Sequence, residues 1–320
     1  MKKKIVFMFS GQGSQYYKMG KELYENHPRF RFWMDHCNEI ARPLTDSSLI
    51  NILYGSHSMQ YAFDNILYSN CALLSIEYSL ARVLMEMEIR PDFFLGYSLG
   101  EISASIIADV ISLKDGMGIV AEMAKLVERK TRTAKMLSII ESKQILKDFP
   151  ELFENCWLTG ENFSKNFVVC GLQKDIAKLM ETLNLNNIVS QMLPVNYGFH
   201  TELIDPIENE FKQIVEKIKL SSAKNIISAF KNRFIEKVDS NYFWQLIRHP
   251  VNFKKTVEWT IENYTCIFID VGPSGSLATF VKYILPDNSN SISIQILNQF
   301  GNDLKSIETL KKRLLIELAL

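Results

Sequence analysis

A serine flanked by glycines is the clearest candidate for chemistry in this sequence. Gly96-Tyr97-Ser98-Leu99-Gly100 follows a short apolar run and precedes a helix-forming stretch, which is the pattern of a nucleophile elbow. A serine on a tight strand-to-helix turn needs glycines beside it because larger side chains would collide there. The turn also directs the amide of Leu99 toward an oxyanion. The pentapeptide alone also occurs in ordinary loops. The prediction that Ser98 is a nucleophile therefore depends on the strand and helix patterns beside it.

A serine nucleophile needs a base, and the sequence offers five histidines. His200 ends the run 194–200, which reads as the exit from a strand before a helix. His249 reads as a turn residue, and His57 lies in a polar loop. A structural histidine that only makes hydrogen bonds is the alternative for His200. The sequence favours a Ser98–His200 dyad, and no His, Cys, Asp or Glu set has the spacing of metal ligands.

Strands and helices alternate along most of the chain, which predicts an α/β fold with a parallel sheet. Patterns typical of strands occupy 4–9, 93–97, 226–230 and 266–271, and helical spacing is clearest at 72–87, 114–128 and 304–318. The intervening region contains strand patterns at 136–140, 166–170 and 188–193 and helix patterns at 144–148 and 174–183. This rhythm predicts a ferredoxin-like α+β subdomain at 131–195, inserted into a catalytic domain formed by 1–130 and 196–320.

Composition restricts the class of protein. A chain of 320 residues with 47% apolar and 22% charged residues can bury a large core, as one domain with an insertion or as two domains. Lys plus Arg and Asp plus Glu number 36 each, so no overall field favours nucleic acid or an anionic membrane. No apolar run has the length of a membrane span or a signal peptide. The five cysteines lack paired spacing, which predicts reduced thiols in a cytoplasmic protein.

Five segments resemble, in order and separation, the malonyl-CoA:acyl carrier protein transacylases and the acyltransferases of polyketide synthases. They are 9–15, 96–101, Asn162 with 168–171, 197–200 and 270–277. The resemblance covers nearly the whole chain and implies an α/β-hydrolase-like core with a ferredoxin-like insertion. It also implies a Ser98–His200 dyad and an oxyanion hole from the backbone N–H groups of Gln12 and Leu99. A backbone carbonyl, near Gln245-Leu246 by this resemblance, would orient the histidine in place of an acidic residue.

The sequence departs from this family where a carboxylate would bind. Family members that handle malonyl place an arginine on the helix after the elbow, and an ungapped count from Ser98 puts Met123 there. An arginine would bind the carboxylate bidentately, whereas methionine offers an apolar surface. Arg129 lies six residues further on, at a different angle around the helix. The alternative is that Met123 only fills the core and that an arginine comes from elsewhere.

Other residues of the predicted acyl pocket also come from the resemblance. Tyr97 stands where the family often has histidine, and Asn70 stands where it has glutamine. Tyr197, Phe199 and Asn162 complete the pocket that the motifs imply. Together with Met123, these residues predict an acyl pocket without a positive charge.

This combination resembles the acyltransferase-like acyl hydrolases encoded beside trans-acyltransferase polyketide synthases, which clear stalled acyl groups from carrier proteins. It implies hydrolysis of short acyl thioesters on the phosphopantetheine arm of acyl carrier protein, with that protein as partner and no separate cofactor. Two alternatives stay open: a trans-acting acyltransferase that loads malonyl or a non-carboxylated acyl group from CoA, and an idle scaffolding subunit. Basic clusters at 125–132 and 311–313 are candidate contacts for an acidic carrier protein, or are simply solvated faces.

Overall fold

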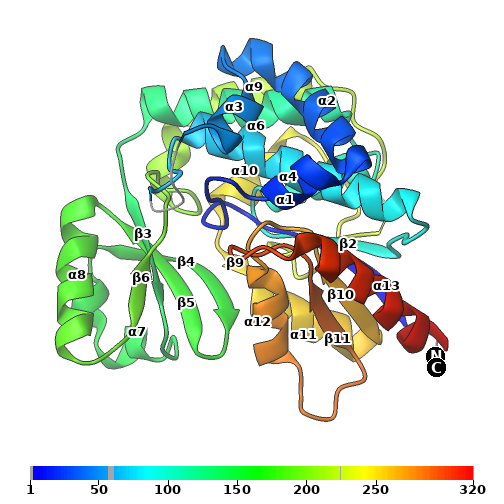
Figure 1. The fold of residues 1–320 in the computed structure, drawn as a ribbon. Coiled ribbons are helices and arrows are strands. Elements are labelled where there is room, and N and C mark those ends of the chain that lie inside the picture. Colours follow the sequence, from blue (N-terminus) through cyan, green and yellow to red (C-terminus); the bar gives the residue numbers. More distant parts are fainter. Residues whose placement is uncertain (1–2, 57–60, 224, 320) are drawn as a thin grey trace.

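Two sheets organise the protein, as Figure 1 shows. The computed structural model describes residues 3–56, 61–223 and 225–319, so His57 lies outside the described residues. The larger sheet carries helices on both faces. The smaller sheet, with β3 to β6 and the helix α8 beside it, lies to the left in Figure 1.

The larger sheet has six strands in the order β11-β10-β1-β2-β7-β8. In chain order they are β1 (Lys4–Phe9), β2 (Phe93–Gly96), β7 (Ile226–Ser228), β8 (Arg233–Phe234), β10 (Cys266–Asp270) and β11 (Ile292–Gln295). Neighbouring strands are parallel except β7 and β8, which are antiparallel. The predicted α/β fold with a parallel sheet is confirmed, and the four strands predicted for this sheet are present.

Strand β1 shows how the sequence specifies burial on both faces of this sheet. Its residues Ile5, Phe7 and Phe9 pack into the larger core, whereas Val6 and Met8 pack into a second cluster on the opposite face. Successive side chains of a strand point to opposite faces, so a strand covered on both sides reads as an unbroken apolar run. The prediction of a buried strand at 4–9 is therefore confirmed.

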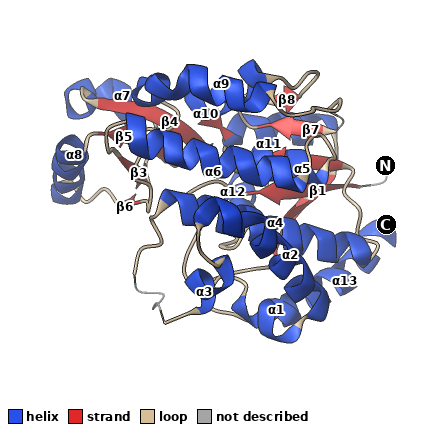
Figure 2. Cartoon of the chain, turned by 90° about the horizontal axis from the view of Figure 1, so that it is seen from above, coloured by secondary structure: helices blue, strands red, loops and turns tan. Residues whose placement is uncertain are grey.

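Helices cover both faces of this sheet, and Figure 2, seen from above, looks onto the larger group of them. The larger layer consists of α1 (Lys21–Asn26), α2 (Pro28–Thr45), α3 (Leu49–Tyr54), α4 (Ile66–Glu86), α5 (Gly100–Ile107), α6 (Leu113–Lys130), α9 (Glu208–Glu216), α10 (Ser240–Arg248) and α13 (Asp303–Ala319). The second layer consists of α11 (Phe253–Asn263) and α12 (Ser276–Ile284). The helix expected to follow His200 begins as a 3₁₀ helix, η2 (Glu202–Ile207), before α9.

The smaller sheet has five strands in the order β6-β3-β5-β4-β9. Its elements are β3 (Lys135–Ile139), α7 (Ile145–Asp148), the 3₁₀ helix η1 (Pro150–Phe153), β4 (Cys156–Phe163), β5 (Asn166–Gly171), α8 (Gln173–Leu185), β6 (Ser190–Met192) and β9 (Val251–Asn252). From β3 to β6 the chain follows the β-α-β-β-α-β order of ferredoxin-like folds. The edge strand β9 comes from the 196–320 segment, so one strand of this sheet lies outside the 131–195 range.

The sequence analysis missed β4, although it pairs with β5 along its length. Register shifts between Leu158 and Gly160 and between Glu161 and Phe163 interrupt the ladder. Bulges of this kind break the two-residue alternation by which a strand is recognised in a sequence. The two-residue alternation of apolar and polar residues therefore did not predict this strand.

Candidate active site

Ser98 lies on a strained turn between β2 and α5. Its backbone φ is +54°, a left-handed conformation that is rare for a residue with a side chain. The flanking glycines are required by contact: a Cβ at Gly96 would lie 2.2 Å from the Cα of Glu101, and a Cβ at Gly100 would lie 2.1 Å from the carbonyl oxygen of Phe9. The turn has the geometry of a nucleophile elbow.

His200 lies within hydrogen-bond distance of Ser98. The Nε2 atom of His200 is 2.7 Å from the Oγ atom of Ser98, although the two residues are 102 positions apart. On the other side of the ring, Nδ1 is 2.7 Å from the carbonyl oxygen of His249. Because a carbonyl only accepts, Nδ1–H is the donor, which leaves the Nε2 lone pair free to take the Ser98 proton.

The carbonyl that orients His200 belongs to His249, so the expected position near Gln245-Leu246 is wrong. The helix α10 continues to Arg248, and the carbonyl of Gln245 accepts the N–H of His249 within the end of that helix. A carbonyl engaged along the helix axis does not point to the side where His200 lies. The carbonyl that meets the His200 ring is that of His249, the residue after the helix.

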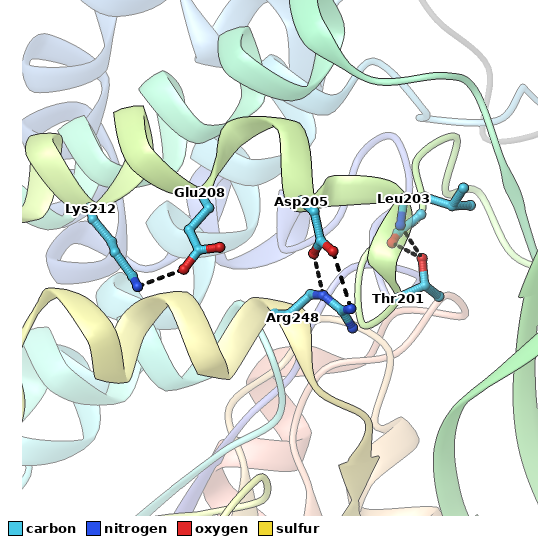
Figure 3. Close-up of polar contacts among 7 residues, drawn as sticks. Thr201, Leu203, Asp205, Glu208, Lys212 and Arg248 are labelled. Carbon is cyan, nitrogen blue, oxygen red and sulfur yellow. Dashed lines mark hydrogen bonds and ion pairs between the residues drawn. The ribbon is translucent and has the colours of Figure 1, made fainter.

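The segment after His200 is also fastened to α10, as Figure 3 shows. The Oγ1 atom of Thr201 accepts the N–H of Leu203 at 3.1 Å and caps η2. The Asp205 carboxylate pairs with the Arg248 guanidinium through both Nε and Nη2, the latter at 3.3 Å. The backbone N–H of His200 itself donates to the carbonyl of Ile247 at 2.8 Å. His200, the predicted base, is therefore held by the end of α10.

The His200 ring is neutral near pH 7. Burial lowers its pKa to about 4, although the His249 carbonyl acts in the opposite direction. Since a general base must be unprotonated, we expect kcat/KM for a small pantetheine thioester to stay level from about pH 7 to about pH 5 and to fall about tenfold per pH unit below about pH 4. A pH–rate profile that falls from pH 6.5 would contradict this assignment of the base.

Gln12 and Leu99 are the residues predicted to supply the amides of an oxyanion hole. Gln12 and Leu99 both border the cavity that contains Ser98 and His200, and no hydrogen bond between described residues uses either backbone N–H. The Gln12 side chain is held aside, because its Nε2 donates to Oδ1 of Asn70. Asn70 in turn donates to the carbonyl of Val120 at 3.2 Å. Asn70 thus positions Gln12 and does not line the cavity.

The cavity beside the dyad is small and mostly apolar. Its volume is about 50 Å³, and since one water molecule needs roughly 10–15 Å³ on this scale, it accepts about four groups of that size. It is lined by Gln12, Tyr97, Ser98, Leu99, Met123, Met136, Thr159, Val168, Leu193, Val195, Phe199, His200 and Ile247. Among the described residues, no lysine or arginine belongs to this lining. Met123 and Phe199 therefore lie where the sequence analysis placed them.

The alternative of an arginine supplied from elsewhere finds no support in the described residues. Arg129 pairs with Glu210 at 2.9 Å and is more than half exposed. Met123 is 2% exposed and contributes to the cavity from α6. Met123 therefore packs in the core and also forms part of the cavity wall.

The other predicted pocket residues lie further from Ser98. Tyr97 borders the small cavity and also a larger one of about 730 Å³ between the two sheets, which Asn162 borders as well. The Tyr97 hydroxyl donates to Oδ1 of Asn162 at 2.9 Å. Tyr197 borders neither cavity, and its backbone pairs with Thr133 at the start of the smaller sheet.

Sequence reasoning missed the wall that the smaller sheet contributes. Met136 of β3 and Val168 of β5 line the cavity, whereas their neighbours Leu137, Phe167 and Val169 pack beneath α8. This alternation is visible in the sequence once strand register is known. The sequence did not show which of the two faces of these strands lines the cavity.

The chain was then compared with known proteins. The acyl transferase domain family matches residues 6–316. The chain belongs to this family. It is 37% identical to "Polyketide biosynthesis acyltransferase homolog PksD" of Bacillus subtilis over 97% of each chain. It is 34% identical to "Polyketide biosynthesis acyltransferase homolog BaeD" of Bacillus velezensis over 98% of each.

Solved structures share the fold of this acyltransferase-family protein. One is the malonyl CoA-acyl carrier protein transacylase of Clostridium perfringens, which is 22% identical over 99% of each chain with a TM-score of 0.80. The family resemblance stated from the motifs is thereby confirmed. Within the described residues, no helix has the length and apolar character needed to cross a membrane, and no group of three or more His, Cys, Asp or Glu side chains is arranged to hold a metal ion.

Proposed function

We propose that this acyltransferase-family protein hydrolyses thioesters of short, uncharged acyl groups carried on the phosphopantetheine arm of acyl carrier protein. The uncharged lining of the cavity that contains Ser98, with Met123 in its wall, supports this proposal most strongly. A malonyl carboxylate in that cavity would meet apolar side chains in place of a cation. Burying an unpaired charge in such surroundings is strongly unfavourable. The volume of the cavity suits an acetyl group or one slightly longer.

The proposed reaction has two half-reactions. In the first, Oγ of Ser98 attacks the thioester carbonyl while Nε2 of His200 takes the hydroxyl proton. The amides of Gln12 and Leu99 donate to the oxyanion. His200 then gives the proton to the departing pantetheine sulfur, which leaves an acyl ester on Ser98 and a free thiol. In the second, His200 deprotonates a water that attacks the ester, and Ser98 regains its proton as the carboxylic acid leaves.

Transfer and hydrolysis share the first half-reaction, so the experiment must follow the second. Acetyl-loaded and malonyl-loaded carrier proteins are each incubated with the enzyme and with an unloaded carrier protein of different mass. The proposal expects free acetate and unloaded donor, with little release of malonate. Movement of the acyl group to the second carrier protein would identify a transferase. Absence of both products, with no acyl ester on Ser98, would favour a scaffolding subunit.

A hydrolase with this selectivity would remove stalled acyl groups from a polyketide synthase and leave malonyl extender units in place. The names of PksD and BaeD, which mention polyketide biosynthesis, support this setting. The uncharged lining of the cavity thus also supports the proposed proofreading role. This role requires a pocket that rejects the malonyl group and accepts the acetyl group that forms when malonyl loses its carboxylate.

Contact with the carrier protein is expected at Arg132. In the 125–132 cluster, Lys125 pairs with Glu122, and both Arg129 and Lys130 pair with Glu210. Arg132 is exposed and has no ion pair among the described residues. In the part of the chain that the structure describes, Arg132 is thus the unpaired cation of its cluster. Because carrier proteins present acidic helices, we expect it to contact the carrier protein.

Reversal of that charge provides the test. Arg132→Glu should raise KM for the acyl-loaded carrier protein by about two- to fivefold at low salt, since exposed ion pairs contribute up to about 1 kcal/mol. The effect should shrink as salt is added, and a small pantetheine thioester should react at the parent rate. Arg42→Glu, at an exposed arginine of α2 outside both basic clusters, is the matched control. An equal change in KM for both variants would argue against a specific role for Arg132.

A further inference from the structure

The two reacting side chains are held by different elements, whose relative position must stay fixed. Ser98 immediately precedes α5, whereas His200 receives its two orienting contacts from the carbonyls of Ile247 and His249 at the end of α10. A shift of α10 relative to α5 would change the distance between Oγ and Nε2 directly. Displacements near 1 Å at a reacting pair cost about 100-fold in rate. A contact that fixes α10 relative to α5 would therefore preserve the distance between these two atoms.

A buried contact joins α5 to α10 directly. Oε1 of the Glu101 carboxyl group, in the first turn of α5, accepts a hydrogen bond from the hydroxyl of Tyr242, in the first half of α10. Glu101 is 0% exposed and Tyr242 is 6% exposed. On the other side, the N–H of Glu101 donates to the carbonyl of Ser98 at 2.9 Å. The contact therefore begins at the nucleophile's own turn.

These contacts close a ring through the active site. From Ser98 the path runs to Glu101, across to Tyr242, and along α10 to the carbonyls that hold His200. From His200 it returns to Ser98 through the 2.7 Å contact. We propose that Glu101 and Tyr242 are positioning residues that fix the distance between the nucleophile and the base. The inference rests on the proposed role of the Ser98–His200 pair, and does not depend on whether water or a thiol accepts the acyl group.

The protonation state of the Glu101 side chain determines which variant should preserve the hydrogen bond with Tyr242. Burial raises the pKa of Glu101 to about 8, against the effects of the Ser228 hydroxyl and the Ala229 amide. The carboxyl is therefore mainly uncharged at neutral pH. Glutamine has nearly the same shape and offers a carbonyl oxygen that accepts from the Tyr242 hydroxyl. Glu101→Gln is thus the conservative variant, and Tyr242→Phe removes only the donor.

The test follows acylation of Ser98, by intact mass after a single turnover with an acetyl thioester and by the rate of labelling with a serine-directed phosphonate. Tyr242→Phe should acylate about tenfold more slowly, with KM for the thioester within about twofold of the parent. Glu101→Gln should retain the parent rate within about twofold. Glu101→Leu removes the same contact from the α5 side and should match Tyr242→Phe, which keeps the test available if the latter does not fold.

A control separates positioning from the stability of α10. Asp239 caps this helix by accepting the N–H of Tyr242 at 2.8 Å, so Asp239→Ala weakens the helix but leaves the hydroxyl contact in place. We expect a lower melting temperature for Asp239→Ala and a parent-like acylation rate. Equal slowing of Asp239→Ala and Tyr242→Phe would overturn the proposal, as would a folded Tyr242→Phe protein that acylates at the parent rate. Failure of the parent itself to form an acyl ester would instead reject the proposed function.

Discussion

Replacing Ser98 with alanine should reduce release of acetate from acetyl-loaded carrier protein by about 1,000-fold or more. The variant removes the only atom that attacks the thioester in the proposed mechanism, and losses of this size are usual for nucleophiles of serine enzymes. Intact mass should show no acyl ester and no phosphonate adduct on the protein. His200→Ala should leave a slow residual reaction at most, because Oγ would then lack its base at 2.7 Å.

A second serine on the same helix provides the control. Ser103 is buried on α5, one turn beyond the elbow, so Ser103→Ala removes a hydroxyl near the site without touching the nucleophile. It should retain the parent rate within a few fold. Parent-rate acid release by Ser98→Ala would show that the elbow does not carry the chemistry.

The second large effect is expected at Met123. Met123→Arg should lower acylation by acetyl and other neutral thioesters, because it places a poorly solvated charge in the cavity that Ser98 shares. The same guanidinium could pair bidentately with a malonyl carboxylate. Since a charge-assisted pair at a desolvated site is worth about 2–5 kcal/mol, the malonyl-to-acetyl ratio of acyl-enzyme should rise at least about 30-fold. Mass spectrometry of the acyl-enzyme with both thioesters measures this ratio.

We expect the rise in the malonyl-to-acetyl ratio to lie at the lower end of that range, because of the surroundings of the new side chain. Asn70, which stands where the family has glutamine, is already engaged with Gln12 and Val120. Tyr97 donates to Asn162. Neither side chain is free to hold an introduced guanidinium in place. Met123→Leu is the matched control, because it keeps the cavity apolar and should leave the ratio unchanged. A parent protein that already prefers malonyl would reverse the proposal in favour of the transferase.

Local sequence patterns were sufficient for the elements whose causes are local. An elbow needs a short buried strand, glycines at two positions and a helix start, and all three lie within the stretch 93–107. The central strand β1 is recognisable because it is buried on both faces and hence unbroken in its apolar run. The alternation of strands and helices likewise predicted the parallel sheet. The histidine at the end of the 194–200 run was chosen as the base from the sequence itself, and the family resemblance then singled out Met123.

The tertiary structure decided which distant groups meet. The carbonyl that orients His200 depends on where α10 ends, which shifted it from the expected stretch to His249. Asn70 and Tyr197 were placed in the pocket by their motifs, yet the structure turns Asn70 toward Gln12 and places Tyr197 outside both cavities. The direction of a side chain depends on register and on packing partners far away in sequence, which a one-dimensional pattern does not encode.

The sequence by itself therefore determined the nucleophile turn, the alternating α/β architecture and the uncharged residue at position 123. Only the tertiary structure decided that Met123, Met136 and Val168 line one cavity, that the bulged strand β4 exists, and that Glu101 meets Tyr242. The first group follows from steric and hydrophobic rules that act within a few residues of one another. The second follows from contacts between residues separated by tens to over a hundred positions, which form only when the whole core packs.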